Sequence, residues 1–307
     1  MGLDHTAELS EFLRTRRARL APEDVGIPAD GTPRRVPGLR REELAQLAGV
    51  STDYYTRLEQ GRHRNVSDSV LGAIARALQL DEDEHAYLVA LAQHHRSGAS
   101  RRCSRPTRPQ RVRAGLQRML SALDPCTPAL ITGRNTQVLA ANRTARALLT
   151  DFEALPYQER NLARFIFLDD CARDLYADWA QVAEDVAAGL RLDASLGRDD
   201  AAFCELIGEL AVKSPEFRGI WAGHRVRRRS HGCTRFRHPQ VGELTLGFES
   251  FTPGDDHDQT LYVYTAEAGT ASETALRLLA QLSGEAADGY SDLPRQTPIP
   301  DLESTPS

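Results

Sequence analysis

Two short amphipathic helices joined by a tight turn constrain this chain more than any other feature. They lie in residues 41 to 62, which read REELAQLAGVSTDYYTRLEQGR. Gly49 stands where a left-handed glycine ends a helix, and Ser51 is a favoured N-cap for the next helix. The residues expected to face inward are Leu44, Leu47, Val50, Tyr55 and Leu58. A turn this short sets the helices at a steep angle, so the segment predicts a helix-turn-helix unit.

The surrounding sequence supplies further short helices. Apolar spacing and capping residues predict helices at 6–20, from Arg40, at 52–60, from near Ser67, and from Asp81 to Gln93. Prolines between the first two helices indicate a long loop. We therefore expect an all-α domain of five helices over residues 1–95.

The composition changes at residues 96–111, which are rich in arginine, include two prolines and contain no acidic residue. This composition is typical of a linker. Beyond it, residues 128–142 predict a hairpin, long helical stripes follow, and residues 242–251 and 260–268 alternate as strands. We expect an α+β domain over residues 112–283. The tail, residues 284–307, is rich in Pro, Ser, Asp and Glu and is predicted to be disordered.

Length and composition exclude some classes of protein. A chain of 307 residues suits two domains, and no run approaches the roughly 18 apolar residues of a membrane span. The N-terminus lacks a signal-peptide pattern, so we expect a cytoplasmic protein without membrane partners. Five scattered cysteines without a CxxC pair favour reduced thiols over a disulfide or zinc framework: Cys103, Cys126, Cys171, Cys204 and Cys233.

The helix-turn-helix segment resembles the Cro-type, xenobiotic-response-element (XRE) family of repressors. The pattern E-x-L-A-x-x-x-G-V-S…L-E-x-G is carried by Glu43, Leu44, Ala45, Gly49, Val50, Ser51, Leu58, Glu59 and Gly61. The resemblance implies that the second helix of the unit lies in the DNA major groove while the first crosses the phosphate backbone. The alternative is an ordinary helical hairpin with a glycine turn.

The geometry of that family assigns roles to the outward side chains. The positions expected to face bases are Thr52, Asp53, Thr56 and Arg57. An arginine can bind guanine bidentately, a threonine can contact a thymine methyl, and an aspartate can accept from cytosine N4. The positions better placed for phosphates are Arg40, Arg41, Tyr54, Arg62 and Arg64. For each arginine, a merely solvated position is the alternative.

Nearly the whole chain resembles the MmyB-like regulators. The segments that carry this resemblance are PGLRREELAQLAGVSTDYYTRLEQGR, ERNLARFIFLDDCARDLYADW, SPEFRGIWAGHRVR and RFRHPQVGELTLGFESF. The resemblance implies a PAS-like sensor domain that holds a small apolar, fatty-acid-like molecule. The chain departs from the family at GRNTQ in the first hairpin, where a tryptophan is common, and at Cys171.

The residues themselves predict apolar strands and helices that could enclose a ligand pocket. Candidate walls are Trp179, Phe248 and Val263. The alternative is a filled core, with the C-terminal domain serving only in dimerisation or protein docking. Arg235, Arg237 and His238 precede a predicted strand and fit either a salt-bridged edge or the polar rim of a ligand site.

Other chemistry has weaker support in the sequence. His224, His231, Cys233 and His238 match no closed zinc spacing, so we expect no metal. A thiol redox sensor at Cys171 or Cys204 has no clear basic neighbour to activate it. Catalytic motifs are lacking, so we expect no enzyme and no cofactor beyond the fatty-acid-like ligand. We expect a ligand-responsive transcription regulator that binds double-stranded DNA as a homodimer on an inverted repeat.

Overall fold

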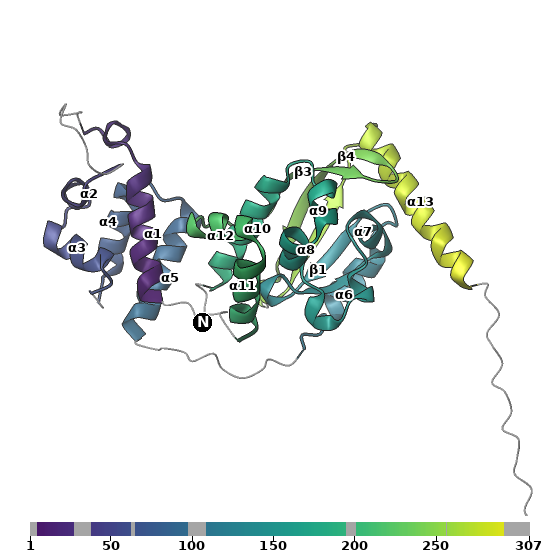
Figure 1. The fold of residues 1–307 in the computed structure, drawn as a ribbon, viewed down its shortest axis with the longest axis horizontal. Coiled ribbons are helices and arrows are strands. Elements are labelled where there is room, and N and C mark those ends of the chain that lie inside the picture. The colour runs from purple at the N-terminus through teal and green to yellow at the C-terminus, as the bar shows by residue number, and fades with distance from the viewer. Residues whose placement is uncertain are drawn as a thin grey trace, which may run out of the picture.

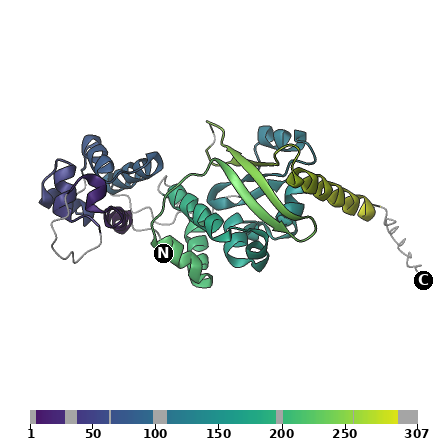
Figure 2. The ribbon, with the colours of Figure 1, turned by 90° about the horizontal axis from the view of Figure 1, so that it is seen from above.

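The chain folds into two bodies joined through residues 98–108 (Figure 1). The computed structural model describes residues 5–27, 38–62, 65–97, 109–194, 201–255 and 257–291. Seen from above, the N-terminal helices form one body and the mixed domain forms the other (Figure 2). The two-domain expectation is therefore confirmed. None of the described helices is long and apolar enough to cross a membrane.

The N-terminal body contains the five expected helices. Leu9, Phe12 and Leu13 on the first helix are fully buried, and they pack in one cluster with apolar residues of the other four. A short 3-10 turn, Pro22–Val25, follows the first helix. The helices are α1 His5–Arg19, α2 Arg41–Leu47, α3 Thr52–Glu59, α4 Asp68–Ala77 and α5 Glu82–Ser97.

The C-terminal body is built on one antiparallel sheet with the strand order β2-β1-β5-β4-β3. The predicted hairpin is present as the first two strands, with Leu130 opposite Ala141. Two further strands match the alternating segments of the sequence, and His231–His238 forms an edge strand that was not predicted. The strands are β1 Ala129–Thr132, β2 Val138–Ala141, β3 His231–His238, β4 Gly242–Phe251 and β5 Thr260–Thr265. This confirms the α+β, PAS-like expectation.

Helices cover the sheet unequally. Most of them pack on the face that carries Phe236, Leu246 and Tyr264 and form the main core. On the opposite face, α6 covers Ile131 and Leu261, while the outer face of β3 and β4 is exposed. The helices are α6 Ala114–Ala122, α7 Arg143–Leu148, α8 Leu162–Leu168, α9 Asp170–Leu175, α10 Trp179–Asp193, α11 Ala201–Lys213, α12 Pro215–Ala222 and α13 Ala271–Ser291. Short 3-10 turns lie at Arg134–Thr136, Phe152–Ala154 and Tyr157–Glu159.

Two boundaries differ from the periodicity of the sequence. Leu175 and Trp179 are spaced as if they lay on one face of a continuous helix. The helix is interrupted between them, where Tyr176 bridges to Phe236 on β3. At the C-terminus α13 continues past Gly284 to Ser291. The remainder of the predicted tail, residues 292–307, lies outside the described residues.

The two bodies meet along α1 and α5. Leu192, at the end of α10, and Val226, after α12, are buried in the apolar cluster of the N-terminal body. Arg19 donates to the carbonyl of Gly223 at 2.8 Å, and Asp83 accepts from the backbone N–H of Arg228 at 2.6 Å. Figure 1 shows α12 beside α1 and α5, with α2 and α3 on the far side of that body.

Candidate functional site

The turn between α2 and α3 fixes the helix that the sequence assigns to recognition. Gly49 has a φ of +67°, and the N–H of Val50 bonds to the carbonyl of Ala45 at 3.0 Å, which ends α2. The Ser51 hydroxyl accepts from the N–H of Tyr54 at 3.1 Å and caps α3. The steep helix pair predicted from the sequence is therefore built by the expected glycine and serine.

The four predicted base-contacting residues lie together on α3. Thr52, Asp53 and Arg57 are exposed, and Thr56 is half-buried. Arg57 pairs with Asp53 across one helical turn at 2.6 Å, and 60% of the arginine side chain is exposed. A pair this exposed contributes little stability, so the guanidinium can leave it for a base edge at small cost.

The predicted phosphate contacts have mixed surroundings. Arg62 is exposed immediately after α3, and Tyr54 is half-buried. Arg41 is 45% exposed and pairs with Glu59 at 2.8 Å, while Arg40 lies 3.8 Å from Glu42. Arg64 lies outside the described residues. Arg62 is therefore the described member least engaged within the protein.

A buried carboxylate orients α3, and sequence reasoning gave it no role. Glu59 accepts from Arg17 of α1 at 2.9 and 3.1 Å and from Arg41 of α2 at 3.0 Å. Burial alone would raise the pKa of Glu59, but the hydrogen bonds and charge of Arg17, joined by Arg41, hold that pKa below its usual value. Three helices are thus joined at one side chain. The L-E-x-G pattern contained this residue without revealing its partners.

The predicted pocket walls are not brought together. Trp179 and Phe248 lie on the helix-covered side of the sheet, where the indole of Trp179 donates to the carbonyl of Ile166 at 2.8 Å. Val263 packs on the opposite side with the cluster under α6. None of the three lines either hollow found among the described residues. They stay a sequence prediction.

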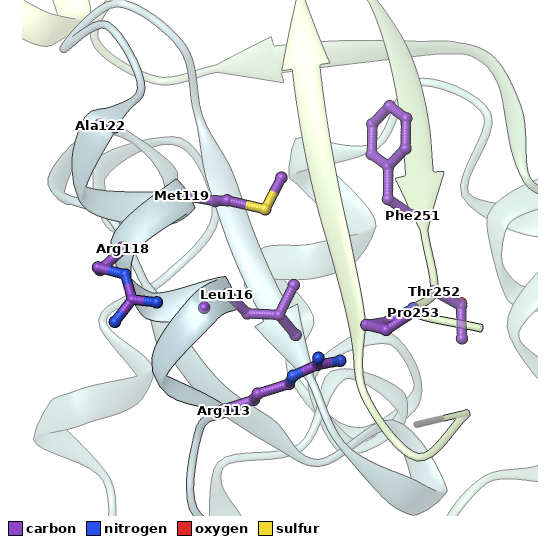
Figure 3. A pocket seen from close by; sticks show the side chains of 9 residues that line it. Arg113, Leu116, Arg118, Met119, Ala122, Phe251, Thr252 and Pro253 are labelled. Carbon is purple, nitrogen blue, oxygen red and sulfur yellow. The ribbon is translucent and has the colours of Figure 1, made fainter. Parts of the chain in front are cut away.

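A different hollow opens on the α6 side of the sheet. It has a volume of about 680 Å³ and lies between α6 and the end of β4. In Figure 3, Leu116 and Met119 project from α6 toward the strands near Phe251 and Pro253. Met119 and Phe251 are each 52% exposed, although both are apolar. We call this hollow the α6 groove.

The charges at the α6 groove are arginines. Arg113 pairs with Asp255 at 2.8 Å. Arg118 is exposed on α6 and lines the groove, and among the described residues no carboxylate is in an ion pair with it. An apolar channel beside a guanidinium can bind an aliphatic chain that ends in an acid. The sequence gave no sign of the groove, because α6 was not predicted.

The residues considered for metal or redox chemistry are dispersed. His224 lies at the contact between the two bodies, whereas His238 is buried and bonds to the carbonyl of Ala147 at 2.9 Å. No group of metal-ligating side chains occurs in the part of the chain that the structure describes. At Cys171, a hydrogen bond to Asp169 raises the thiol pKa, which disfavours a reactive thiolate.

Arg235 settles one alternative. It forms a two-point ion pair with Asp178, with N to O distances of 2.6 and 2.7 Å. It lies on β3, the edge of the sheet, so this segment is a salt-bridged edge strand rather than the rim of either hollow.

Comparison with known families gives two matches that divide the chain at the linker. Residues 8–88 match a helix-turn-helix domain, and residues 112–279 match the ligand-binding domain of the MmyB-like transcription regulators. The second match covers more than half of the chain. Comparison with curated proteins gave no match.

Proposed function

Because this chain belongs to the MmyB-like transcription regulators, we propose that it reads operator DNA as a homodimer through α3 under the control of a small apolar ligand. DNA binding and a ligand-binding domain follow from the two families. The operator type, the dimer and the nature of the ligand are the further steps of the proposal.

The observation that carries the DNA part is the exposed face of α3. Thr52, Asp53 and Arg57 project from a helix whose opposite side is fixed by buried Tyr55, Leu58 and Glu59. An α-helix fits the major groove, which is about 12 Å wide. A two-fold dimer would place two copies of α3 on half-sites about one DNA turn apart, which supports an inverted-repeat operator.

Arg57 and Arg62 separate base reading from phosphate binding. We expect Arg57→Ala to weaken binding to an operator selected from random duplexes by about 5- to 150-fold, because a base-edge contact is worth about 1–3 kcal/mol. Arg62→Ala should weaken all duplexes alike and lower the salt dependence of log K by about one unit per protomer. Fluorescence anisotropy over a series of salt concentrations measures both effects.

The matched control is Arg14→Ala, which removes an equally exposed arginine from α1. It should leave operator binding close to that of the wild type. Equal losses on operator and scrambled DNA for Arg57→Ala would contradict the base-reading role.

The α6 groove supports an apolar, acid-ended ligand. Its walls are Leu116, Met119, Phe251 and Pro253, and Arg118 supplies a positive charge at its side. In the main core, in contrast, aromatic rings such as Phe167, Phe217 and Trp221 pack directly against one another. We therefore place a fatty-acid-like molecule in the groove.

A thermal-shift series with straight-chain fatty acids tests this placement. A ligand that binds the native state stabilises it by RT ln(1 + [L]/Kd), about 2.7 kcal/mol at a hundredfold excess over Kd. Phe251→Asp should abolish the shift, because it places a carboxylate in the groove. Val212→Asp, at a residue that is 80% exposed on α11, is the control and should keep the shift.

Met119 and Phe251, the exposed apolar side chains in the groove, also fit the alternative of a dimerisation or docking module. If no fatty acid shifts the wild type, and Phe251→Asp instead converts a dimer to a monomer in sedimentation, that alternative replaces the sensing part of the proposal. Arg57 would keep its role in either case.

A further inference from the structure

A buried polar cluster lies where the two bodies meet. We call it the junction cluster, and it consists of Glu8 and Arg16 on α1, Tyr87 on α5, Arg191 on α10 and His224 after α12. Arg191 is 1% exposed, Arg16 3% and Glu8 8%. Charged side chains are this deeply buried only when they are paired, so the cluster is a specific connection between the domains.

Arg191 is the centre of the cluster. Its guanidinium is ion-paired with Glu8, bonds to the Trp221 carbonyl and lies 4.0 Å above the Trp221 ring. The same Nη1 lies 3.0 Å from Nδ1 of His224. Glu8 also accepts from the Tyr87 hydroxyl at 2.6 Å. One sensor arginine is thereby bound to the helix core of the N-terminal domain.

A second arginine makes the reverse contact, from the N-terminal domain to the sensor domain. Arg16, on α1, donates to the backbone carbonyl of His224 at 2.9 Å and pairs with Glu84 at 2.8 Å. Each domain therefore contributes a buried cation to the other. Leu192 follows Arg191 and Val226 lies two residues after His224, and both are buried in the apolar cluster of the N-terminal domain.

The free energy of burying these ion pairs favours a contact between the domains that can open. Burying an ion pair costs desolvation energy that its mutual attraction roughly offsets, so such pairs specify an arrangement more than they stabilise it. When the domains separate, water solvates both charges and recovers that cost. When one partner is removed, the other stays buried without compensation in the docked state.

Two helices connect this cluster to the sensor core. The middle of α10 packs in the main core through Ala183 and Ala187, and its end carries Arg191. The distance from Trp179 to Arg191 is about 18 Å along the helix. Likewise α12 buries Phe217 in the core and presents the Trp221 carbonyl to Arg191. A shift of α10 would move Arg191 relative to Glu8, and a shift of α12 would move the Trp221 carbonyl that Arg191 binds.

We propose that the Glu8–Arg191–His224 contact holds the sensor domain docked on the DNA-binding domain, and that the state of the sensor opens or closes it through α10. This regulation deepens the proposed function and rests on it. Docking occurs on α1 and α5, while α3 lies on the far side (Figure 1). The contact therefore sets the pose of the DNA-binding domain and leaves its access to DNA unchanged.

His224 makes the docked state sensitive to acid. Burial and the charges of Arg191 and Arg16 lower its pKa from 6.5 to about 4. Nδ1 of His224 lies 3.0 Å from Nη1 of Arg191, which can only donate, and 3.2 Å from Oε1 of Glu8, which can only accept. The contact with Arg191 requires an unprotonated Nδ1, and a protonated Nδ1 would donate to Glu8 while facing the charge of Arg191. The ionisable groups that face the imidazole or border the cluster are Glu8, Glu11, Arg14, Arg16, Glu84, Tyr87 and Arg191.

The sign of the effect follows from linkage. Above pH 6.5 the imidazole is neutral in the docked and undocked states, and docking has its full strength. As the pH falls from 6.5 toward 4, only the undocked imidazole takes up a proton, so docking weakens by up to tenfold per pH unit.

Hydrogen exchange on the full chain tests the proposal without DNA or ligand. The variants are Arg191→Met, Glu8→Gln and the double variant, and Glu8→Gln keeps an oxygen that can accept from Tyr87. The control is Arg235→Met, which breaks an exposed ion pair with Asp178 inside the sensor and outside the measured segment. Small-angle X-ray scattering adds the overall dimension of each protein.

We expect both single variants to exchange at least tenfold faster at residues 221–226 and to have a larger radius of gyration, with intact helices in each domain. The double variant should exchange no faster than either single variant, and Arg235→Met should match the wild type. Should Arg191→Met fail to fold, Glu8→Gln gives the same readout.

Wild-type exchange rates and dimensions in both single variants would overturn the proposal. So would equally fast exchange at residues 221–226 in Arg235→Met. Binding of the same proteins to a half-site and to a full operator separates this result from the proposed function. Opening the contact should change the affinity for the full operator and leave the affinity for the half-site the same. A wild-type chain that binds neither duplex would overturn the proposed function but not the docking contact.

Discussion

At the scale of single residues, the role of an arginine near α3 depends on the carboxylate with which it pairs. Arg57 and Arg41 are both arginines near α3, yet one is in an exposed pair with Asp53 and the other is bound to buried Glu59. Arg57 is free to exchange partners, whereas Arg41 helps to hold α3. The sequence predicts a DNA contact for both, but only the fold shows that Arg41 also holds α3 in place.

Glu59 is the residue whose loss should disturb the DNA-binding domain most. We expect Glu59→Gln to lower the free energy of unfolding by about 3 kcal/mol, because Arg17 is left buried without its counter-ion. Urea unfolding measures this loss. Glu11→Gln is the control, since its pair with Arg14 is exposed and is worth under about 1 kcal/mol.

The pH dependence of the Glu59 contribution has a definite sign. Because the folded pKa of Glu59 lies below its usual 4.5, its stabilisation is complete above that value and is lost as the pH falls through the folded pKa. The difference in stability between wild type and Glu59→Gln should therefore shrink in acid. A difference that is independent of pH would contradict this account.

At the scale of elements, local signals located most helices and strands. Gly49 and Ser51 cap the helices that they were expected to cap, because capping depends only on neighbouring backbone groups. The edge strand β3 was missed, since its alternation of buried Thr234 and Phe236 with arginines gains meaning only once β4 pairs with it. Helix α6 was missed because it follows the arginine-rich linker.

Gly61 shows how an element end can depend on a distant contact. Its φ is +67°, and a Cβ there would lie 2.3 Å from Cγ2 of Thr6 on α1. We expect Gly61→Ala to destabilise the domain by about 2–4 kcal/mol, from left-handed strain and overpacking together. Chemical denaturation measures this.

A glycine within α11 provides the comparison. A Cβ on Gly208 would meet no atom within 4 Å, so Gly208→Ala should stabilise the chain by about 0.5–1 kcal/mol. Adding Thr6→Ala to Gly61→Ala should restore part of the loss. If Gly61→Ala were as harmless as Gly208→Ala, the packing of α3 against α1 would need revision.

At the scale of the whole molecule, domain order and class could be predicted from the sequence, but the contact between domains could not. Glu8 and Arg191 are separated by 183 positions, and no periodicity relates them. His224 packs near the end of a helix, where its side chain contacts Arg191 of its own domain and Glu8 of the other domain. The α6 groove likewise joins segments that only the folded sheet brings together.

The central claim is that two copies of α3 read an operator with two-fold symmetry. Selection of bound duplexes from a random pool by the full-length protein, followed by sequencing, tests it most directly. The account predicts enrichment of an inverted repeat whose half-sites are centred about 34 Å apart, or a whole number of DNA turns. Failure to enrich any sequence, or enrichment of a single asymmetric site, would contradict it.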